Sequence, residues 1–458
     1  MSTPTVLVLP SPTQGHVIPM MSLSHKLVEH GCNIIFVNSD FNHERVVTSM
    51  ENINNNDSSS LYSSPIKLVS IPDGLGPEHD RVNFGELCDS MLSTMPSELE
   101  KLIEDMHMKE GIKVTCIVAD VYMGWALKVA NKLGIKGAFF CPTSASVFVL
   151  QYNAPNLVAD GILDSDGFPI SESEKPLWLS SSIPGMDIES CWWLRLFDPL
   201  VEKRMFKYAI HCISHSNLTE WCLCNSTQEL EPEAFTLAPK LLTPIGPLLP
   251  TTTSSLGQFW KQDMSCMTWL DQQPHCSVVY VAFGSHTLFD QRQFIELALG
   301  LELTNRPFLW VVRRDPNCTN YVSLPSEFEG CKGKIIGWAP QKMVLSHPAI
   351  ACFVSHCGWN STLEAFCNGV PLMCWPYFGD QFSNKSYVCD GLKVGMGFDS
   401  DENGLVSRGE IKAKVDQLIS DEDTRSRSQK LMEKLKHSME EGSTSSKNLS
   451  KFVTWLKE

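Results

Sequence analysis

The chain of 458 residues alternates short apolar runs with helical patterns, and it does so in two successive series. Apolar runs typical of strands occupy residues 6–9, 33–37, 67–71, 114–119 and 136–140 in the first series, and 277–283, 308–312, 334–336, 351–354 and 371–374 in the second. Helical stretches such as 20–29 and 125–133 lie between them. Strands that alternate with helices are typical of parallel sheets joined by crossover helices. The sequence therefore predicts an α/β protein with two doubly wound parallel-sheet domains.

A passage rich in Pro, Thr and Ser follows Leu241 and separates the two series, as an interdomain linker would. We predict an N-terminal Rossmann-like domain over residues 1–245, the linker over 246–265 and a C-terminal Rossmann-like domain over 266–435. The remaining residues, 436–458, are predicted to form a helix that packs back toward the N-terminal domain.

Charge and composition exclude several classes of partner. The formal net charge of −15 argues against nucleic acid or an anionic membrane surface. No apolar run approaches the ~20 residues of a membrane-spanning helix, and the N-terminus lacks the basic leader of a signal peptide. The 17 cysteines are odd in number, and several lie in apolar strand-like runs, where Cys behaves as a small hydrophobe. We therefore expect a reduced, cytoplasmic protein, and a monomer because nothing suggests an obligate oligomer.

The predicted topology places polar residues at the ends of neighbouring strands. In a doubly wound sheet of order 3-2-1-4-5, the first and fourth strands are neighbours, and ligands bind beyond their carboxyl ends. The first strand leads to His16 and the fourth to Asp120, so we expect these two side chains to meet. In the second series the corresponding strands lead to Ser285 and His356. Ser285 is the weakest of these candidates, because a Gly-Ser turn after a strand is common.

The stretch 338–381 carries the clearest functional pattern. Within it, the apolar run 351–354 leads to His356 and a Gly, and a helical pattern begins near Asn360 and Ser361. A helix N-terminus presents unpaired backbone N–H groups and the positive end of the helix dipole, both of which favour an anion. His356 and Ser361 add side-chain donors. The sequence therefore predicts a site for a diphosphate that is held without a metal.

Residues on either side of this anion site suit the other parts of a nucleotide sugar. Trp338 offers a flat face for a base, and Gln341 is close enough in sequence to hydrogen-bond the base edge. Glu364 lies one helical turn after the polar start of the helix, so its carboxylate would accept from ribose hydroxyls. Acceptors and donors suited to sugar hydroxyls close the stretch at Asp380 and Gln381.

This stretch closely resembles the donor-binding signature of plant UDP-dependent glycosyltransferases that act on small-molecule secondary metabolites. Its Trp, Gln, His-Cys-Gly-Trp-Asn-Ser, Glu and Asp-Gln positions all match, and Gly379, where many relatives carry Ala, is a small departure. The resemblance runs nearly end to end. It implies the GT-B fold, in which two such domains face each other across a cleft, the first binding the acceptor and the second the UDP-sugar. It also implies roles for individual residues: Trp338 and Ala339 at the uracil, Gln341 at the base or ribose, Glu364 at the ribose, His356, Asn360 and Ser361 at the diphosphate, and Trp359, Asp380 and Gln381 at the sugar.

Transfer of a sugar to an acceptor oxygen requires a base, and neutral imidazole, with a reference pKa near ~6.5, suits this role near neutral pH. Asp120 would fix the tautomer of His16 and stabilise its protonated form. We therefore hypothesise a single inverting displacement with His16 as the base. The family places the same pair in these roles and sets Thr143 near the sugar. Taken singly, His16 and Asp120 also suit helix caps or turns, and Trp338 and Trp359 suit a core.

The acceptor is the least determined partner. Side chains that are individually more often core than pocket are predicted to form an apolar wall for it: Met123, Trp125, Phe148, Trp192, Trp193 and Phe378. Their character favours a flat or greasy aglycone, such as a flavonoid or other phenolic or a terpenoid, attacked through a hydroxyl or carboxyl. Gln381 resembles the residue of glucose-using relatives, so UDP-glucose is the expected donor.

Two alternatives belong to other classes. A catalytically inactive UDP-sugar-binding regulatory protein would keep the donor stretch but lose the base, and His16 and Asp120 are both retained. A dinucleotide-dependent oxidoreductase would share the doubly wound halves. However, no strand is followed by Gly-x-Gly-x-x-Gly with an acidic residue about 20 positions further on.

We expect neither a cofactor nor a metal. Residues 399–410 match the positions of a calcium loop. However, Ser407 followed three residues later by Glu410 predicts a capping box that already accounts for the Glu. The segment 164–166 imitates the Asp-x-Asp metal motif of another glycosyltransferase architecture, but it lies in a Gly- and Pro-rich insertion, where a solvated loop is expected.

Overall fold

The computed structural model describes residues 3–51, 66–79, 81–170, 188, 191–238, 242–249, 257–313 and 323–458. The chain forms two compact units. Unit 1 comprises Met1–Trp260, Phe378–Asp380 and His437–Glu458, and unit 2 comprises Lys261–Tyr377 and Gln381–Lys436. Residues 250–256 of the predicted linker lie outside the described residues. In the part of the chain that the structure describes, no helix combines the length and apolar character needed to cross a membrane.

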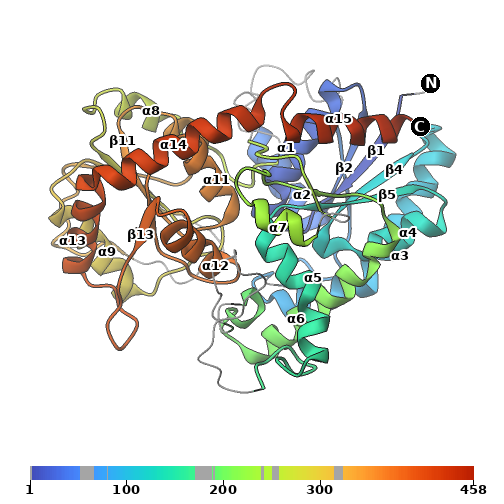
Figure 1. Ribbon diagram of the computed structural model, residues 1–458, viewed down its shortest axis with the longest axis horizontal. Helices are drawn as coiled ribbons and strands as arrows, with labels where there is room; N and C mark the ends of the chain where they lie inside the picture. Colours follow the sequence, from blue (N-terminus) through green and yellow to red (C-terminus); the bar gives the residue numbers. More distant parts are fainter. Residues whose placement is uncertain are drawn as a thin grey trace. The chain divides into compact units, whose positions relative to one another are not determined.

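Unit 1 is built on a seven-stranded parallel sheet in the order β3-β2-β1-β4-β5-β6-β7. Figure 1 labels β2, β1, β4 and β5 of this sheet. Its strands are β1 (Thr5–Leu9), β2 (Asn33–Ser39), β3 (Ile66–Ile71), β4 (Cys116–Asp120), β5 (Lys136–Cys141), β6 (Cys222–Cys224) and β7 (Leu242–Pro244). The first five strands fall on the five predicted runs, and β1 pairs with β4, so the predicted order is confirmed. Sequence reasoning missed β6 and β7 because three residues are too few to show a pattern.

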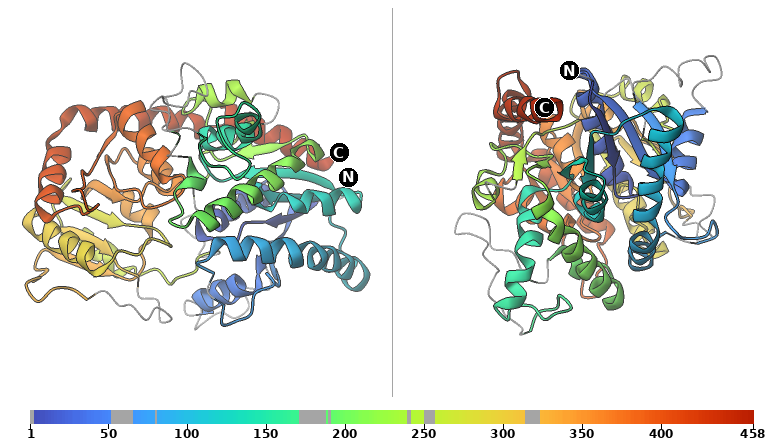
Figure 2. Two further views of the ribbon diagram at one scale, coloured as in Figure 1. Left: turned by 90° about the horizontal axis from the view of Figure 1, so that it is seen from below. Right: turned by 90° about the vertical axis from the view of Figure 1, so that its right-hand side faces the viewer.

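Side chains on successive residues of β1 point to opposite faces of this sheet, and each face has its own core. Val6 and Val8 pack with residues of α1 (Gln14–Glu29) and of α15 (Thr444–Lys457). Leu7 and Leu9 belong to the core on the other face, where Figure 2 shows further helices. The helices that contribute to this second core are α3 (Phe84–Glu110), α4 (Trp125–Lys132), α5 (Ala145–Ala159), α6 (Pro199–Ile213) and α7 (Pro232–Leu237). Helix α2 (Asp40–Glu51) follows β2.

Unit 2 repeats the arrangement with a six-stranded parallel sheet in the order β10-β9-β8-β11-β12-β13. Its strands are β8 (Val278–Ala282), β9 (Phe308–Val311), β10 (Gly333–Ile336), β11 (Ile350–Ser355), β12 (Leu372–Cys374) and β13 (Gly395–Gly397). The first five fall on the predicted runs. The short β13, with glycines at both ends, has no apolar run and was not predicted.

Helices cover this second sheet, and α9 and α13 lie side by side on it (Figure 1). Val279 and Val281 of β8 pack with apolar residues of both helices. The helices of unit 2 are α8 (Ser265–Leu270), α9 (Gln291–Leu303), α10 (Gln341–Leu345), α11 (Trp359–Cys367), α12 (Gln381–Ser386), α13 (Arg408–Ser420) and most of α14 (Glu422–Met439), with a π-helical turn, η5 (Tyr387–Gly391), after α12. Both units are therefore doubly wound parallel-sheet structures, as predicted.

Candidate active site

His16 and Asp120 meet at one edge of the sheet in unit 1. His16 lies in the first turn of α1, shortly after β1, and Asp120 is the last residue of the neighbouring strand β4. The Nδ1 atom of His16 and the Oδ2 atom of Asp120 are 2.7 Å apart. This confirms the predicted contact, and its cause is topological, because parallel neighbouring strands end at the same edge of a sheet.

Both carboxylate oxygens of Asp120 are engaged, so its orientation is fixed. Oδ1 accepts from the backbone N–H of Tyr122 at 2.9 Å and thereby caps the short helix η1 (Val121–Met123). An ionised carboxylate only accepts hydrogen bonds, so Nδ1 of His16 carries the proton and Nε2 is left as the free base. Asp120 is fully buried, whereas 20% of the His16 side chain is exposed. His16 is therefore oriented by the buried Asp120 and keeps one nitrogen available to act as a general base.

The pKa of His16 is raised above its usual value. Burial alone would lower the pKa, but the charge of Asp120 and its hydrogen bond outweigh burial, with a smaller contribution from Asp380. Asp380 belongs to unit 1, together with Phe378 and Gly379. The backbone N–H of Gly379 donates to the carbonyl of Arg195 at 3.0 Å. The raised pKa means that the imidazolium formed by proton uptake is stabilised where His16 sits.

In unit 2, the imidazole of His356 is enclosed by two glycines. His356 follows β11, and a Cβ atom added at either Gly284 or Gly358 would lie 2.5 Å from its Nε2 atom. Burial, followed by the charge of Arg313, lowers the pKa of His356 to about 4, so the ring is neutral at physiological pH. Its Nδ1 atom is buried and has no hydrogen-bond partner within the described ranges. A neutral imidazole in this state can donate a hydrogen bond to an oxygen atom of a bound ligand.

The sequence analysis missed Arg313, whose charge acts on this ring, and Thr287, to which Arg313 donates. The Arg313 guanidinium donates to the carbonyl of Ser285 and, at 2.6 Å, to that of Thr287, which fixes the loop after β8. The Thr287 hydroxyl is buried and has no partner among the described residues. The Ser285 hydroxyl instead contacts Nδ1 of His286 at 2.8 Å. A Thr two positions after a Gly-Ser turn gives no distinctive sequence signal, because its burial depends on the fold.

The helix N-terminus predicted to hold an anion is present. Helix α11 begins at Trp359, and its N-cap residue, Gly358, provides no side-chain cap for the first N–H groups. Cys357 has a φ of 66°, which turns the chain sharply between β11 and the helix. The amide of Asn384 donates to the Cys357 carbonyl at 3.0 Å and holds this turn. The first turn of α11 is therefore preorganised and carries no side-chain cap, as the predicted diphosphate site requires.

Gln341, Ser361 and Glu364 form one hydrogen-bonded group. The Gln341 amide nitrogen donates to the Ser361 hydroxyl at 2.9 Å and to a Glu364 oxygen at 2.8 Å. The Tyr280 hydroxyl donates to the Gln341 carbonyl oxygen at 3.1 Å. Burial raises the pKa of Glu364 to about 7. Tyr280 gave no sequence signal, because an aromatic residue in a buried strand usually serves only the core.

The remaining predicted donor residues lie as follows. Trp338 and Asn360 are half-buried, whereas Trp359 and Ala339 are buried. The buried Gln381 accepts from the backbone N–H of Tyr377 at 2.8 Å. Thr143 follows β5 in unit 1, is half-buried and contacts the Cys141 sulfur through its hydroxyl at 3.4 Å.

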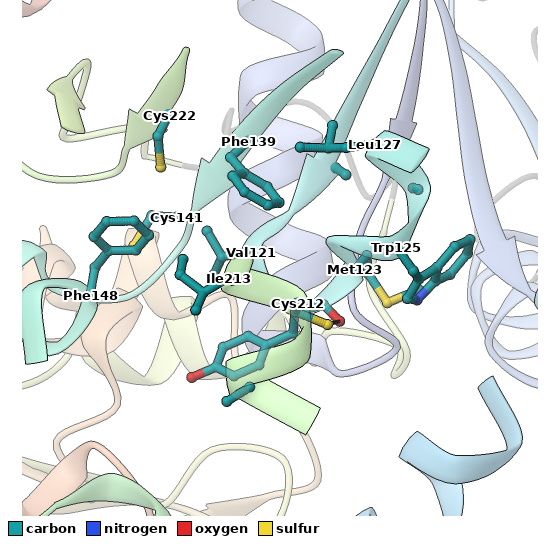
Figure 3. Packing of buried hydrophobic residues seen from close by; sticks show 14 of the residues in the cluster. Val121, Met123, Trp125, Leu127, Phe139, Cys141, Phe148, Cys212, Ile213 and Cys222 are labelled. Atoms are coloured by element: carbon teal, nitrogen blue, oxygen red, sulfur yellow. Dashed lines mark hydrogen bonds between the residues drawn. The ribbon is translucent and has the colours of Figure 1, made fainter. Parts of the chain in front are cut away.

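The predicted acceptor wall receives little support from the structure. Figure 3 shows Met123, Trp125 and Phe148 among the packed residues of the core, where 2% or less of each is exposed. Trp192 and Trp193 belong to the same core, because both fall in the short helix η3 (Trp192–Leu194), which packs inward. The half-buried Phe378 stacks on Phe84, with 6.1 Å between ring centroids. Of these residues, only Phe378 retains substantial exposure.

The two segments that imitate metal motifs have other partners. Ser407 caps α13 by accepting from the backbone N–H of Glu410 at 3.2 Å, as predicted. The Glu410 carboxylate accepts from the backbone N–H of Asp399 at 3.0 Å, so the reciprocal half of the predicted capping box is not seen among the described residues. Asp166 pairs with Lys203 at 2.6 Å and with Lys207 at 2.7 Å. Within the described ranges, no cluster of three or more His, Cys, Asp or Glu side chains is arranged to hold a metal.

Comparison with known proteins agrees with the site in unit 2. Residues 246–434 match the family model for UDP-glucuronosyl and UDP-glucosyl transferases. UDP-glycosyltransferase 83A1 of Arabidopsis thaliana is 42% identical over the whole of this chain and 97% of its own length. The 7-deoxyloganetin glucosyltransferase of Gardenia jasminoides is 33% identical over 98% of this chain and 96% of its own.

Solved structures agree with the fold. Os79 of O. sativa in complex with UDP has a TM-score of 0.79 and 27% identity, with 98% of this chain and all of the other covered. A UDP-glucosyltransferase of Polygonum tinctorium, solved with 3,4-dichloroaniline, has a TM-score of 0.81 and 25% identity over all of this chain and 99% of the other. The chain belongs to the UDP-glucuronosyl and UDP-glucosyl transferase family and has the GT-B fold. It is an inverting UDP-glycosyltransferase that acts on small molecules, and no comparison supports the inactive alternative.

Proposed function

We propose that this enzyme transfers glucose from UDP-glucose to a hydroxyl or carboxyl group of a small apolar aglycone, with His16 as the general base. The observation that carries this proposal is the 2.7 Å contact between His16 and Asp120. Nε2 of His16 takes the proton of an acceptor hydroxyl while the acceptor oxygen attacks the anomeric carbon from the face opposite UDP. Asp120 stabilises the imidazolium that results. A carboxylic acid acceptor is already ionised near neutral pH and depends less on the base.

The departing UDP is stabilised by the donors of unit 2. These donors are the N–H groups at the start of α11, which has no side-chain cap, the neutral imidazole of His356 and the Thr287 hydroxyl. The buried Nδ1 atom of His356 and the buried Thr287 hydroxyl have no hydrogen-bond partner among the described residues. Fixed donors that face developing negative charge lower the barrier to departure. Glu364 accepts from the ribose, and Gln341 orders that carboxylate through their 2.8 Å hydrogen bond. No metal takes part in this scheme.

The support for glucose as the transferred sugar and for an apolar aglycone comes from the relatives and not from the shape of a pocket. The Gardenia relative is named for the glucosylation of 7-deoxyloganetin, and a Prunus dulcis relative, 33% identical, is a (R)-mandelonitrile β-glucosyltransferase. Both aglycones are small, so phenolics, including flavonoids, and terpenoids form the first acceptor panel. We further propose a cytoplasmic monomer, a location supported by described cysteines that are all free thiols and mostly buried.

The test compares His16→Ala with His30→Ala, which removes an imidazole at the other end of the same helix. Each protein is incubated with UDP-glucose and a panel of phenols, terpenoid alcohols and carboxylic acids, and both UDP release and product mass are measured. We expect His16→Ala to lose about 10²-fold or more in kcat on hydroxyl acceptors, with unchanged affinity for UDP. His30→Ala should behave as wild type. Near-normal turnover by His16→Ala would contradict the assignment of the base.

A further inference from the structure

A buried glutamine begins the helix that carries His16. Gln14 is the first residue of α1, two positions before His16, and only 6% of it is exposed. The residue before it, Thr13, provides no side-chain cap for the helix, and Gly15 has no side chain with which to anchor the first turn. The backbone N–H of His16 donates to the Thr13 carbonyl at 3.0 Å, so the base moves with this turn. The position of His16 therefore depends on what holds Gln14.

The Gln14 amide is bound at both ends by residues far along the chain. Its oxygen accepts from the backbone N–H of Phe259 at 3.0 Å. Its nitrogen donates to the Gly257 carbonyl at 3.4 Å and to the Gln258 side-chain oxygen at 3.2 Å. A side-chain amide has one acceptor oxygen and one NH₂ donor group, and both are used here. These contacts lie within unit 1 and span 243 to 245 positions in the sequence.

The segment 257–259 is itself fixed on unit 1. The Ser49 hydroxyl of α2 donates to the Gln258 carbonyl at 2.7 Å. Phe259 is 7% exposed and belongs to the same core as Val17 of α1. A Cβ atom added at Gly257 would lie 3.4 Å from the Val17 side chain, so this segment lies directly against the first turn of the helix. Gln14 thus joins the start of α1 to a segment that is already held by α2 and by the core.

We infer that Gln14 is a positioning residue for the base: it fixes the first turn of α1 against residues 257–259 and so keeps His16 on Asp120. This inference rests on the proposed role of His16 and deepens it. A methionine side chain would fill much the same space but would make none of the three hydrogen bonds. The first turn would then shift, and a displacement of about 1 Å can cost up to about 10²-fold in rate. Asp120 cannot follow such a shift, because the backbone N–H of Tyr122 holds its other carboxylate oxygen at 2.9 Å.

The pKa of His16 reports whether the imidazole stays on Asp120. Burial lowers this pKa, whereas the charge of Asp120, its hydrogen bond and the smaller effect of the Asp380 charge raise it. The other titratable group beside the imidazole is Tyr122, whose ring centroid lies 5.4 Å from that of His16. If Gln14 keeps His16 on Asp120, loss of the Gln14 amide should lower the pKa of His16. A loss of stability elsewhere in the fold would leave it unchanged.

The matched control is Gln293, a buried glutamine of α9 in unit 2. It is 8% exposed, and its amide both donates to and accepts from the backbone of Val406, at 2.9 Å in each case. Gln293→Met therefore removes a buried amide that is bound at both ends, as Gln14→Met does, but leaves α1 intact.

The experiment assays each full-length variant with UDP-glucose and the hydroxyl acceptors that the wild type uses. We expect Gln14→Met to lose about tenfold or more in kcat, with unchanged KM for UDP-glucose and unchanged affinity for UDP in calorimetry. Gln293→Met should keep the wild-type kcat although its melting temperature falls. Ser49→Ala, which releases the same segment from α2, should lower kcat less than Gln14→Met. In the double variant it should add little to the loss, because both changes act through residues 257–259.

NMR titration of the histidine side chains measures the pKa of His16 without any acceptor, and loss of a signal in His16→Ala assigns it. The pKa should be lower in Gln14→Met than in the wild type and unchanged in Gln293→Met. Either a wild-type kcat or an unchanged His16 pKa in Gln14→Met would overturn the inference. Equal losses of kcat in Gln14→Met and Gln293→Met would also overturn it, because the effect would then be one of general stability.

Two further outcomes are distinguished by the same measurements. If Gln14→Met did not fold, Ser49→Ala would decide, and a wild-type kcat and His16 pKa in that variant would contradict the inference. If the wild type released no UDP from UDP-glucose with any acceptor, the proposed function would fail. The His16 pKa in Gln14→Met and Gln293→Met would still show whether Gln14 holds the imidazole on Asp120.

Discussion

The two glycines that enclose His356 allow the donor site to be tested without removing any functional side chain. Gly284→Ala and Gly358→Ala each place a Cβ atom 2.5 Å from Nε2 of His356. Ordinary van der Waals contact begins at 3.4 Å, so the ring must move by about 0.9 Å in either variant. Misplacement of catalytic groups by about 1 Å costs up to about 10²-fold. We therefore expect a 10- to 100-fold weaker affinity for UDP.

A third variant, Gly404→Ala, distinguishes the effect of backbone strain from the effect of this clash. Gly284 has a φ of +66°, in the left-handed region, where a side chain costs roughly 1–2 kcal/mol. Gly404, in the same unit, has a φ of +78° with open space around its Cα, so Gly404→Ala introduces the strain alone. Gly358 lies outside this region, so Gly358→Ala introduces the clash alone.

Calorimetric titration with UDP and thermal denaturation distinguish these effects, and neither requires the acceptor to be known. Affinity for UDP should fall in Gly284→Ala and Gly358→Ala and stay unchanged in Gly404→Ala. The melting temperature should fall in Gly284→Ala and Gly404→Ala, by a few degrees for each kcal/mol. If both clash variants bound UDP as tightly as wild type, the inference that His356 contacts the diphosphate would be wrong.

Four further predictions follow from the hydrogen bonds and pKa shifts. Because Asp120 raises the pKa of His16, kcat/KM on hydroxyl acceptors should fall as the pH drops through a value above ~6.5. In Asp120→Asn this fall should occur at lower pH. If a pH–rate profile showed the fall at the same pH in both proteins, His16 and Asp120 would not act as a pair. Stability from the pair is complete below the unfolded pKa of His16 and is lost as pH rises through the folded value. Burial raises the pKa of Glu364 to about 7, so UDP affinity should rise with pH through that value in wild type but less in Glu364→Gln, as calorimetry of both proteins across pH can show. The Glu231 carboxylate accepts four hydrogen bonds at 2.6 to 2.9 Å, from the backbone N–H groups of Ala145 and Ser146 and from the hydroxyls of Ser146 and Ser226. Glu231→Ala should therefore lower the free energy of unfolding, measured in urea, by about 3 kcal/mol. A loss below about 1 kcal/mol would show that these hydrogen bonds contribute little to stability. EDTA should leave the rate of UDP release unchanged, whereas loss of activity that magnesium restores would refute metal-independent transfer.

Much of the fold was predictable because strand order follows from a few strong local patterns. Ten apolar runs identified ten strands, and the rule for doubly wound sheets then placed β1 beside β4 and β8 beside β11. The contact between His16 and Asp120 followed from this order alone. The missed strands β6, β7 and β13 have three residues each, and their pairing is decided by neighbours distant in sequence.

The sequence by itself determined the order of the first five strands of each sheet, the polar residues at the strand ends and the pattern of the donor stretch, because apolar runs and motifs are local patterns and the rule for doubly wound sheets supplies the order. Only the tertiary structure decided which side chains are enclosed and what they contact. It placed Met123 and Trp125 in a core and left the Thr287 hydroxyl without a hydrogen-bond partner in the described part of the chain. Burial depends on elements far apart in sequence, so the chemistry of a buried hydroxyl has no local sequence signal.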